Sequence, residues 1–377
     1  MASLTLKNVW KKYGKIVALK GVTFTVKDGE LLTILGPSGA GKTSLLQTIA
    51  GVEEIAAGQI FIDQQRVDQL PSPERDIAMV FETYALYPNK TVYQNMAFPL
   101  HSPFRKLPKN EIDQKVEEIA QLLQIDWLLD RNVSQLSGGQ RQRVALGRML
   151  VRNPRIFLMD EPIAHLDAKL RHRLRGELKN IQRKFGITTL YTTHDYREAL
   201  GMGDRVVVIN QGNILQIAEP EKIFNFPKND FVGGLVGDPP MNFFESILDS
   251  SPQGMVLRND AFEVRLNPEL IKIINNLNLN RLKIGLRPSD ILISPTPMKD
   301  FFPAEIYVVE PLGMIQILTL AQNKLKFQAK YSGSIPYEMS QKIYFGFQPE
   351  KLHYFHPVTG FNILSNEEES NSGLISD

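Results

Sequence analysis

An eight-residue stretch of this chain, Gly36 to Thr43, has the composition of a loop that binds phosphate. It reads Gly-Pro-Ser-Gly-Ala-Gly-Lys-Thr, follows the apolar run 31–35 and opens a stretch of helical character, 43–50. Glycines let backbone N–H groups turn toward an anion, and a helix N-terminus adds positive potential. Because a strand, this loop and a helix follow in the order that triphosphate binding requires, we predict a nucleotide site rather than a plain glycine-rich turn.

The residue types of this stretch predict how a nucleotide is held. Lys42 would bring fixed positive charge to the β- and γ-phosphates, and Thr43 would offer its hydroxyl to Mg²⁺. We expect ATP and Mg²⁺ as ligands. The predicted nucleotide contacts here are Gly36, Ser38, Gly39, Ala40, Gly41, Lys42, Thr43 and Ser44.

Three further motifs carry acids, a histidine and a second glycine-rich helix start. The apolar run 156–159 ends in Asp160 and Glu161, residues 192–195 read Thr-Thr-His-Asp, and residues 136–140 read Leu-Ser-Gly-Gly-Gln. A carboxylate such as Asp160 is a hard oxygen ligand that suits Mg²⁺, directly or through water. A solvated acid at a strand end and an ordinary strand-end histidine are the alternative interpretations.

The run 136–143 resembles the signature sequence of ATP-binding-cassette (ABC) ATPases, and the other motifs stand in the order of that family. The resemblance covers roughly residues 3 to 360. It implies that Glu161 orients or deprotonates the attacking water and that His194 contacts the γ-phosphate. It also implies that Tyr13 stacks on adenine and that Asp167 belongs to the D-loop.

The signature run has its own implication. Ser137, Gly138, Gly139 and Gln140 present a hydroxyl, free N–H groups and a helix dipole to an anion. One small domain is not expected to place both glycine-rich segments, 36–43 and 136–140, around the same phosphate. By resemblance, the signature meets the nucleotide of a partner subunit, which implies a dimer with two composite sites that closes on ATP.

Two positions depart from the family pattern. Glu82 stands where the family has glutamine, and Ala164 stands where a serine is common. A carboxylate can ligate Mg²⁺, with Thr43 and Asp160, but cannot donate a hydrogen bond as an amide does. Both changes leave open a weakly active subunit that pairs with a different cassette.

Composition limits the remaining classes. The 377 residues favour two domains, and zero cysteines exclude disulfides and thiolate metal sites. No apolar run reaches the length of about 18 to 20 residues that spans a bilayer, and we expect no secretion signal. A net charge of +2 gives no support for a nucleic-acid groove.

The pattern predicts an α/β fold. We expect an ABC-type nucleotide-binding domain over 1–235, with a P-loop core and a helical subdomain near 84–152, then a Gly/Pro-rich boundary. Over 236–364 the resemblance implies a small OB-like β-barrel regulatory domain, and 365–377 is predicted to be a disordered acidic tail. The predicted strands of the second domain are 243–248, 261–266, 282–286, 305–309, 315–320 and 342–347.

The resemblance implies the ATP-hydrolysing, energy-coupling subunit of a membrane importer, peripheral on the cytoplasmic face of the cell membrane. Its expected partners are two transmembrane permease subunits gripped near residues 82–100, a second identical or paralogous ABC subunit and, indirectly, an extracytoplasmic substrate-binding protein. Residues 241–243 and 347–355 resemble segments of the sugar-importing group, which implies sugars or related polyols, with sulfate, ferric-ion or polyamine import as the alternative. The chain has one cassette and no sustained heptads, which disfavours a soluble ABC ATPase that acts on nucleic acid or ribosomes. A regulatory role of the C-terminal domain stays open.

Overall fold

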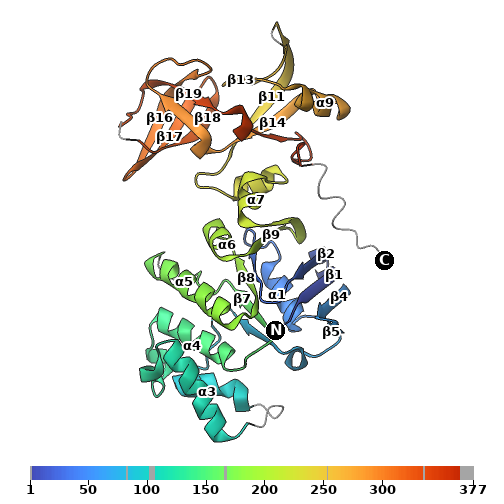
Figure 1. Cartoon of the computed structure of the whole chain (residues 1–377), viewed down its shortest axis with the longest axis vertical. Helices are drawn as coiled ribbons and strands as arrows, with labels where there is room; N and C mark the ends of the chain where they lie inside the picture. Colours follow the sequence, from blue (N-terminus) through green and yellow to red (C-terminus); the bar gives the residue numbers. More distant parts are fainter. Residues whose placement is uncertain are drawn as a thin grey trace. The chain divides into compact units, whose positions relative to one another are not determined.

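The computed structural model describes residues 2–81, 84–101, 107–164, 168–252, 254–333 and 336–365 (Figure 1). Three features predicted from the sequence lie outside these ranges: Glu82, Asp167 and, except for Ser365, the C-terminal tail. The chain divides into two compact units, residues 1–220 and 221–377.

The division between the units falls at Pro220, ahead of the boundary that the sequence predicts after residue 235. The reason is that the intervening helices bond to the second unit. Lys283 Nζ lies 2.6 Å from an Asp230 carboxylate oxygen, and the Asn362 N–H donates to the Lys228 carbonyl at 2.8 Å. The two helices are α7 (Pro220–Asn225) and α8 (Asp230–Leu235).

A six-stranded sheet forms the centre of the first unit, with strand order β10-β9-β3-β8-β7-β6. All neighbours in it are parallel except β9 and β10. Because parallel strands end at the same edge, the segments that follow β3, β7 and β8 come together there. The strands are β3 (Leu31–Leu35), β6 (Ile77–Val80), β7 (Ile156–Asp160), β8 (Thr188–Thr193), β9 (Arg205–Asn210) and β10 (Asn213–Ala218).

A second, antiparallel sheet of four strands has the order β2-β1-β4-β5. Helix α1 (Lys42–Ala50) packs in the core that both sheets share, where its Leu45 and Ile49 are fully buried with Leu6 and Ile34. The antiparallel strands are β1 (Leu4–Tyr13), β2 (Ile16–Val26), β4 (Ala57–Ile62) and β5 (Gln65–Arg66). This packing fixes the start of α1 against the edge of the central sheet.

In its described residues, the segment predicted to be a helical subdomain contains the α-helices α2 (Val92–Ala97), α3 (Lys109–Leu122) and α4 (Gly138–Leu150). Figure 1 shows α3 and α4 together at one end of the unit. Their apolar faces meet in a core that contains Met96, Val116 and Leu146 and extends to Phe157 and Met159 of β7. Helices α5 (Ala168–Phe185) and α6 (Tyr196–Met202) follow β7 and β8. No described helix is long and apolar enough to cross a membrane.

The second unit contains two five-stranded antiparallel sheets around one core, into which Phe244, Ile306, Phe327 and Phe345 all point. The six strand segments predicted beyond residue 240 each overlap a strand of these sheets, while an OB-like barrel stays a prediction. The elements are β11 (Asn242–Ser251), β12 (Gly254–Arg258), β13 (Glu263–Arg265), α9 (Pro268–Asn276), β14 (Arg281–Leu286), β15 (Ile291–Ser294), β16 (Phe302–Leu312), β17 (Ile315–Gln322), β18 (Leu325–Tyr331), β19 (Lys342–Phe347) and β20 (His353–Phe355).

Candidate active site

The predicted phosphate loop connects β3 to α1 and passes close to β9. A Cβ atom at Gly36 would lie 2.3 Å from the Ile209 carbonyl oxygen, so no larger residue fits there. Gly41, which precedes the first residue of α1, has φ 106°, in the left-handed region that favours glycine. The glycines therefore serve the close approach and the sharp turn on which a phosphate cradle depends.

A cavity of about 570 Å³ opens beside this loop, a volume within the usual range for small-ligand sites. One group of lining residues was predicted from the sequence: Tyr13, Ser38, Gly39, Gly41, Lys42, Thr43, Ser44 and Glu161. A second group was not: Ile16, Val17, Ala18 and Lys20 of β2, and Gln211 and Gly212 of the β9–β10 turn. The other two predicted loop contacts, Gly36 and Ala40, do not line the cavity, and Ala40 is buried at 2% exposure.

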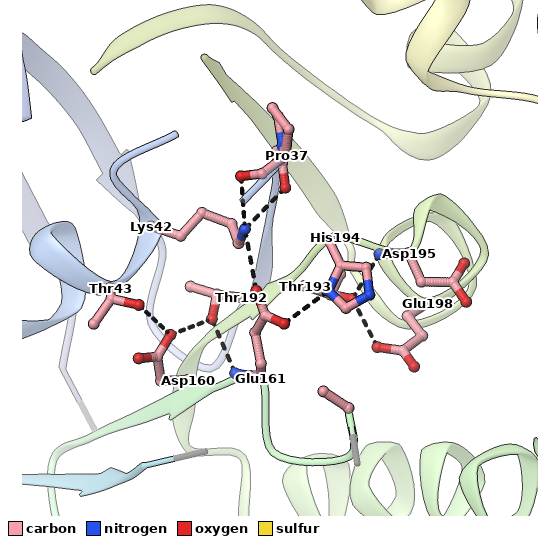
Figure 2. A network of polar contacts seen from close by, with 12 residues as sticks. Pro37, Lys42, Thr43, Asp160, Glu161, Thr192, Thr193, His194, Asp195 and Glu198 are labelled. Carbon is pink, nitrogen blue, oxygen red and sulfur yellow. Dashed lines mark hydrogen bonds and ion pairs between the residues drawn. The ribbon is translucent and has the colours of Figure 1, made fainter. Parts of the chain in front are cut away.

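The ammonium group of Lys42 is held by contacts to the phosphate loop and to Glu161 (Figure 2). Its Nζ donates to the carbonyl oxygens of Gly36 at 2.9 Å and Pro37 at 3.0 Å, and lies 3.1 Å from Glu161 Oε1. The side chain is 5% exposed, so this charge is poorly screened by water. It is placed to attract anionic groups that enter the cavity.

Oxygen atoms of Thr43, Asp160 and Thr192 converge next to Lys42 (Figure 2). Asp160 Oδ1 accepts a hydrogen bond from Thr43 Oγ1 at 3.3 Å and another from Thr192 Oγ1 at 2.8 Å. No group of three or more acidic, histidine or cysteine side chains that could hold a metal ion occurs among the described residues. A pair of protein oxygens supplemented by phosphate and water is the usual Mg²⁺ arrangement, so Thr43 and Asp160 fit this ion.

Glu161 lies between Lys42 and His194. Its Oε2 is 2.7 Å from His194 Nδ1, and its other carboxylate oxygen faces Lys42. The residue has φ 44°, an unfavourable value for a side chain of this size, and its N–H donates to Thr192 Oγ1 at 3.0 Å. The fold therefore holds Glu161 in a strained conformation at the cavity, as is common for residues that act in chemistry.

The electrostatics of Glu161 follow from these contacts. Burial raises the pKa of Glu161, but hydrogen bonds from His194 and Lys42, with the Lys42 charge, outweigh it and leave the pKa below its usual range. Glu161 is therefore a carboxylate at neutral pH, an acceptor for a water proton or for a donor at His194.

Tyr13 lines the same cavity from the end of β1, with 39% of its surface exposed. On one side of its ring lies Lys11 Nζ, 4.7 Å from the ring centroid. Lys11 is itself tied to Glu53 at 2.7 Å, so the position of this cation is fixed. A ring supported in this way has a face available for stacking, as the predicted adenine contact needs.

The signature residues lie elsewhere in the unit. Ser137 caps α4: its Oγ accepts from the Gln140 N–H at 3.4 Å, and Gln140 Oε1 accepts from the Ser137 N–H at 2.9 Å. None of the residues 137–140 lines the described cavity, although Ser137 is exposed. The fold brings together the loop, the two acids and His194, and it leaves the signature, including Gly138 and Gly139, separate from them.

Sequence reasoning missed Thr192, whose hydroxyl links Asp160 to the backbone of Glu161. A signal was present, because a run of threonines is unusual in a buried central strand, and Thr192 and Thr193 are both almost fully buried.

Sequence reasoning also missed the β9–β10 turn, where Gly212 lies against Ala18 and a Cβ at Gly212 would meet the Ala18 carbonyl oxygen at 2.6 Å. A Gln-Gly pair between two apolar strands could have suggested that turn.

Comparison with known proteins gives a consistent picture. The family model "ABC transporter" matches residues 19–164. The chain is 42% identical to the trehalose/maltose import ATP-binding protein MalK of Thermococcus litoralis, over 96% of this chain and 99% of that protein. It is 40% identical to the xylose/arabinose import ATP-binding protein XacK of Haloferax volcanii, over 99% and 98%.

Solved structures agree for the first unit. A dimeric ATP-binding cassette in a post-hydrolysis state with ADP and Pi matches with a TM-score of 0.52 and 32% identity, over 58% of this chain and 98% of that one. The CbiO1 subunit of an ABC transporter complex from Clostridium perfringens matches with a TM-score of 0.54 and 30% identity, over 58% and 89%. Since the curated relatives match over almost their entire length, this chain belongs to the ABC transporter family, as one of its ATP-hydrolysing subunits.

Proposed function

We propose that this chain is the energy-coupling subunit of an importer for sugars or related polyols, and that Glu161 and His194 carry out ATP hydrolysis. The observation that supports the catalytic assignment best is the placement of Glu161 between Lys42 and His194, at 3.1 and 2.7 Å. The substrate class rests on the relatives of this chain, among them a trehalose/maltose and a xylose/arabinose import protein.

Nucleotide binding is proposed to use the cavity described above. Tyr13 would stack on the adenine, the loop N–H groups and Lys42 would hold the phosphates, and Thr43 and Asp160 would hold Mg²⁺. When bound, this ion would neutralise phosphate charge and polarise the phosphoryl group. Glu82, predicted as a further ligand, lies outside the described residues.

The Lys42–Glu161 ion pair suggests how binding prepares the base. Lys42 contributes to lowering the pKa of Glu161, after the contribution of His194. A triphosphate in the cavity would compete for the Lys42 ammonium and weaken this pair. The pKa of Glu161 would then rise, which makes the carboxylate a better proton acceptor for water once the nucleotide is bound.

The partners of this chain are also part of the proposal. Ser137 to Gln140 would contact the nucleotide of a second ABC subunit, and Asp167 would lie at that interface. The segment 84–100 would contact two permease subunits at the cytoplasmic face of the membrane. Arg148 of α4 orders this segment, because its guanidinium donates to the carbonyl oxygens of Tyr84 and Ala85 at 2.8 Å each. The same side chain lies over the Tyr87 ring, so α4 links the signature to the proposed permease surface.

Two alternatives differ in what they predict. A sulfate, ferric-ion or polyamine importer would use the same ATPase chemistry with another substrate-binding protein. A weakly active subunit in a heterodimeric cassette pair would follow from Glu82 and Ala164. Purifying the chain with its permeases and binding protein, then measuring which ligand stimulates its ATPase activity, separates the other substrates from sugars. The same preparation shows whether the second ABC subunit is identical to this chain or different. The C-terminal unit is proposed to be an OB-like dimer-contact and regulatory domain.

Glu161→Gln tests the catalytic assignment. The change keeps the shape of the side chain and removes its basicity, so we expect ATP to bind normally and turnover to fall by about 10²- to 10⁴-fold. The exposed Glu74→Gln serves as a matched control that should retain full activity. Hydrolysis by Glu161→Gln at the parental rate would show that another group activates the water.

A further inference from the structure

A buried acid behind the candidate active site, Glu198 of α6, has no role in the contacts described so far. It is 3% exposed and its Oε2 accepts two hydrogen bonds, from Tyr191 Oη at 3.1 Å and from Thr193 Oγ1 at 2.8 Å. A buried carboxylate costs free energy unless it is well paired, so contacts of this quality indicate a defined task. Figure 2 shows Glu198 directed toward the segment that carries His194.

The first connection from Glu198 leads to His194. The Thr193 hydroxyl donates to Glu198, and it accepts from the Asp195 N–H at 3.0 Å. The residues on both sides of His194 are therefore fixed by one hydroxyl group. The His194 side chain is 56% exposed, so packing holds it weakly and its position depends on this backbone.

The second connection leads to Glu161. Arg171 of α5 lies with its Nε 3.8 Å from Glu198 Oε1, and its Nη2 donates to the Ala164 carbonyl at 2.9 Å. The Ala164 N–H in turn donates to the Glu161 carbonyl at 3.2 Å, closing the turn after the strained Glu161 backbone. One carboxylate is thus connected to the backbone of both His194 and Glu161.

We propose that Glu198 is a positioning residue that sets the geometry of the Glu161–His194 pair through Thr193 on one side and Arg171 on the other. The inference rests on the proposed roles of Glu161 and His194. Glu198 itself is not proposed to contact the nucleotide. Loss of the carboxylate should let both segments shift, and a displacement of about 1 Å at reacting groups can cost on the order of 10²-fold in rate.

Steady-state ATP hydrolysis and nucleotide binding by the full-length chain test this proposal. Glu198→Ala should lower kcat by about 10- to 100-fold while the affinity for a fluorescent ATP analogue changes by less than about twofold. Thr193→Val should reproduce part of the loss, and Thr193→Ser, which keeps the hydroxyl, should not. Glu177→Gln removes an ion-paired carboxylate from the neighbouring helix α5 and should leave kcat unchanged.

A double-mutant cycle separates positioning from general damage to the fold. If Glu198 acts through the Glu161–His194 pair, adding Glu198→Ala to a variant that carries both Glu161→Gln and His194→Ala should cause little further loss of kcat. A further loss as large as that in the parental background would overturn the proposal, as would full activity of Glu198→Ala. If Glu161→Gln and His194→Ala both keep full activity, the proposed catalytic roles fail first. If Glu161→Gln and His194→Ala lose activity while Glu198→Ala keeps full activity, only the positioning role of Glu198 is refuted.

Discussion

His194 and Lys42 contact different oxygens of the same carboxylate: His194 Nδ1 lies 2.7 Å from Glu161 Oε2, and Lys42 Nζ lies 3.1 Å from Oε1. The acid is therefore oriented by two donors from separate segments, the start of α1 and the residue that follows β8. Each of them helps to keep the pKa of Glu161 below its usual range. Removing either donor should change the acid's orientation and its basicity together.

His194→Ala tests the first of these donors. Hydrolysis should fall by about 10- to 100-fold because Glu161 loses its orienting partner, while ATP affinity stays within about twofold of the parental value. Steady-state turnover and equilibrium binding measure the two effects. His172→Ala, at an exposed position of α5, is the control and should behave like the parent. An equal loss of affinity and turnover would place His194 in ground-state binding instead.

Ser137→Arg tests whether the signature acts on a partner's nucleotide. Since residues 137–140 do not line the described cavity, ATP binding to the isolated chain should be nearly unchanged. A bulky cation at an exposed helix start should prevent ATP-driven dimerisation, which light scattering detects. Ser134→Arg, at another exposed serine just before α4, is the matched control. Dimerisation of Ser137→Arg on ATP would contradict the composite-site proposal.

The parts of the site that the sequence predicts well are those in which one local pattern decides the outcome. The loop 36–43 lies between a strand and a helix, as expected, and Asp160 reaches Thr43 because β3 and β7 end at the same edge of a parallel sheet. The stretch of helical character predicted over 43–50 is likewise part of a helix, Lys42–Ala50.

Contacts between distant segments could not be predicted in this way. The wall that β2 contributes to the cavity depends on an antiparallel sheet whose strand pairing no local pattern specifies. The division of the chain at Pro220 depends on tertiary contacts such as Lys283–Asp230, which no local pattern specifies. Glu198 gave no signal, since an acid in a polar helix looks solvated until its partners Tyr191 and Thr193 are known.

Glu82→Gln addresses a departure from the family pattern that lies outside the described residues. If Glu82 lies near the γ-phosphate, as its place after β6 suggests, its charge repels the phosphate. Two unit charges about 5 Å apart repel by at most roughly 3 kcal/mol at an effective dielectric of about 20, before the metal neutralises them. A third of that would change the rate about fivefold. We expect higher ATPase activity for the variant, most clearly at low Mg²⁺, and equal or lower activity across a Mg²⁺ titration would contradict the repulsion.

The C-terminal unit contains a titratable group that should make its stability depend on pH. His353 begins β20, where it pairs with Gly285 of β14. Burial lowers the pKa of His353 to about 4, and the charges of Arg287 and Lys351 act in the same direction. The ring is therefore neutral in the folded protein at neutral and mildly acidic pH.

The unfolded chain differs, because its histidines titrate near 6.5. Above that value both states carry a neutral His353, and the folded state has its full stability. As the pH falls from 6.5 toward 4, only the unfolded chain takes up the proton, so stability is progressively lost. Between pH 7 and pH 5 the loss should be at most about 2 kcal/mol from this residue.

Thermal unfolding of the parental chain and of His353→Phe at both pH values measures this effect. The variant keeps an aromatic ring next to Phe355 and cannot take up a proton, so the destabilisation of its C-terminal unit between pH 7 and pH 5 should be smaller by that amount. The other titratable groups are common to both proteins, and the difference therefore isolates His353. Direct titration of the His353 ring by NMR provides the independent check: a midpoint near 6.5 in the folded protein would show that burial does not hold the ring neutral.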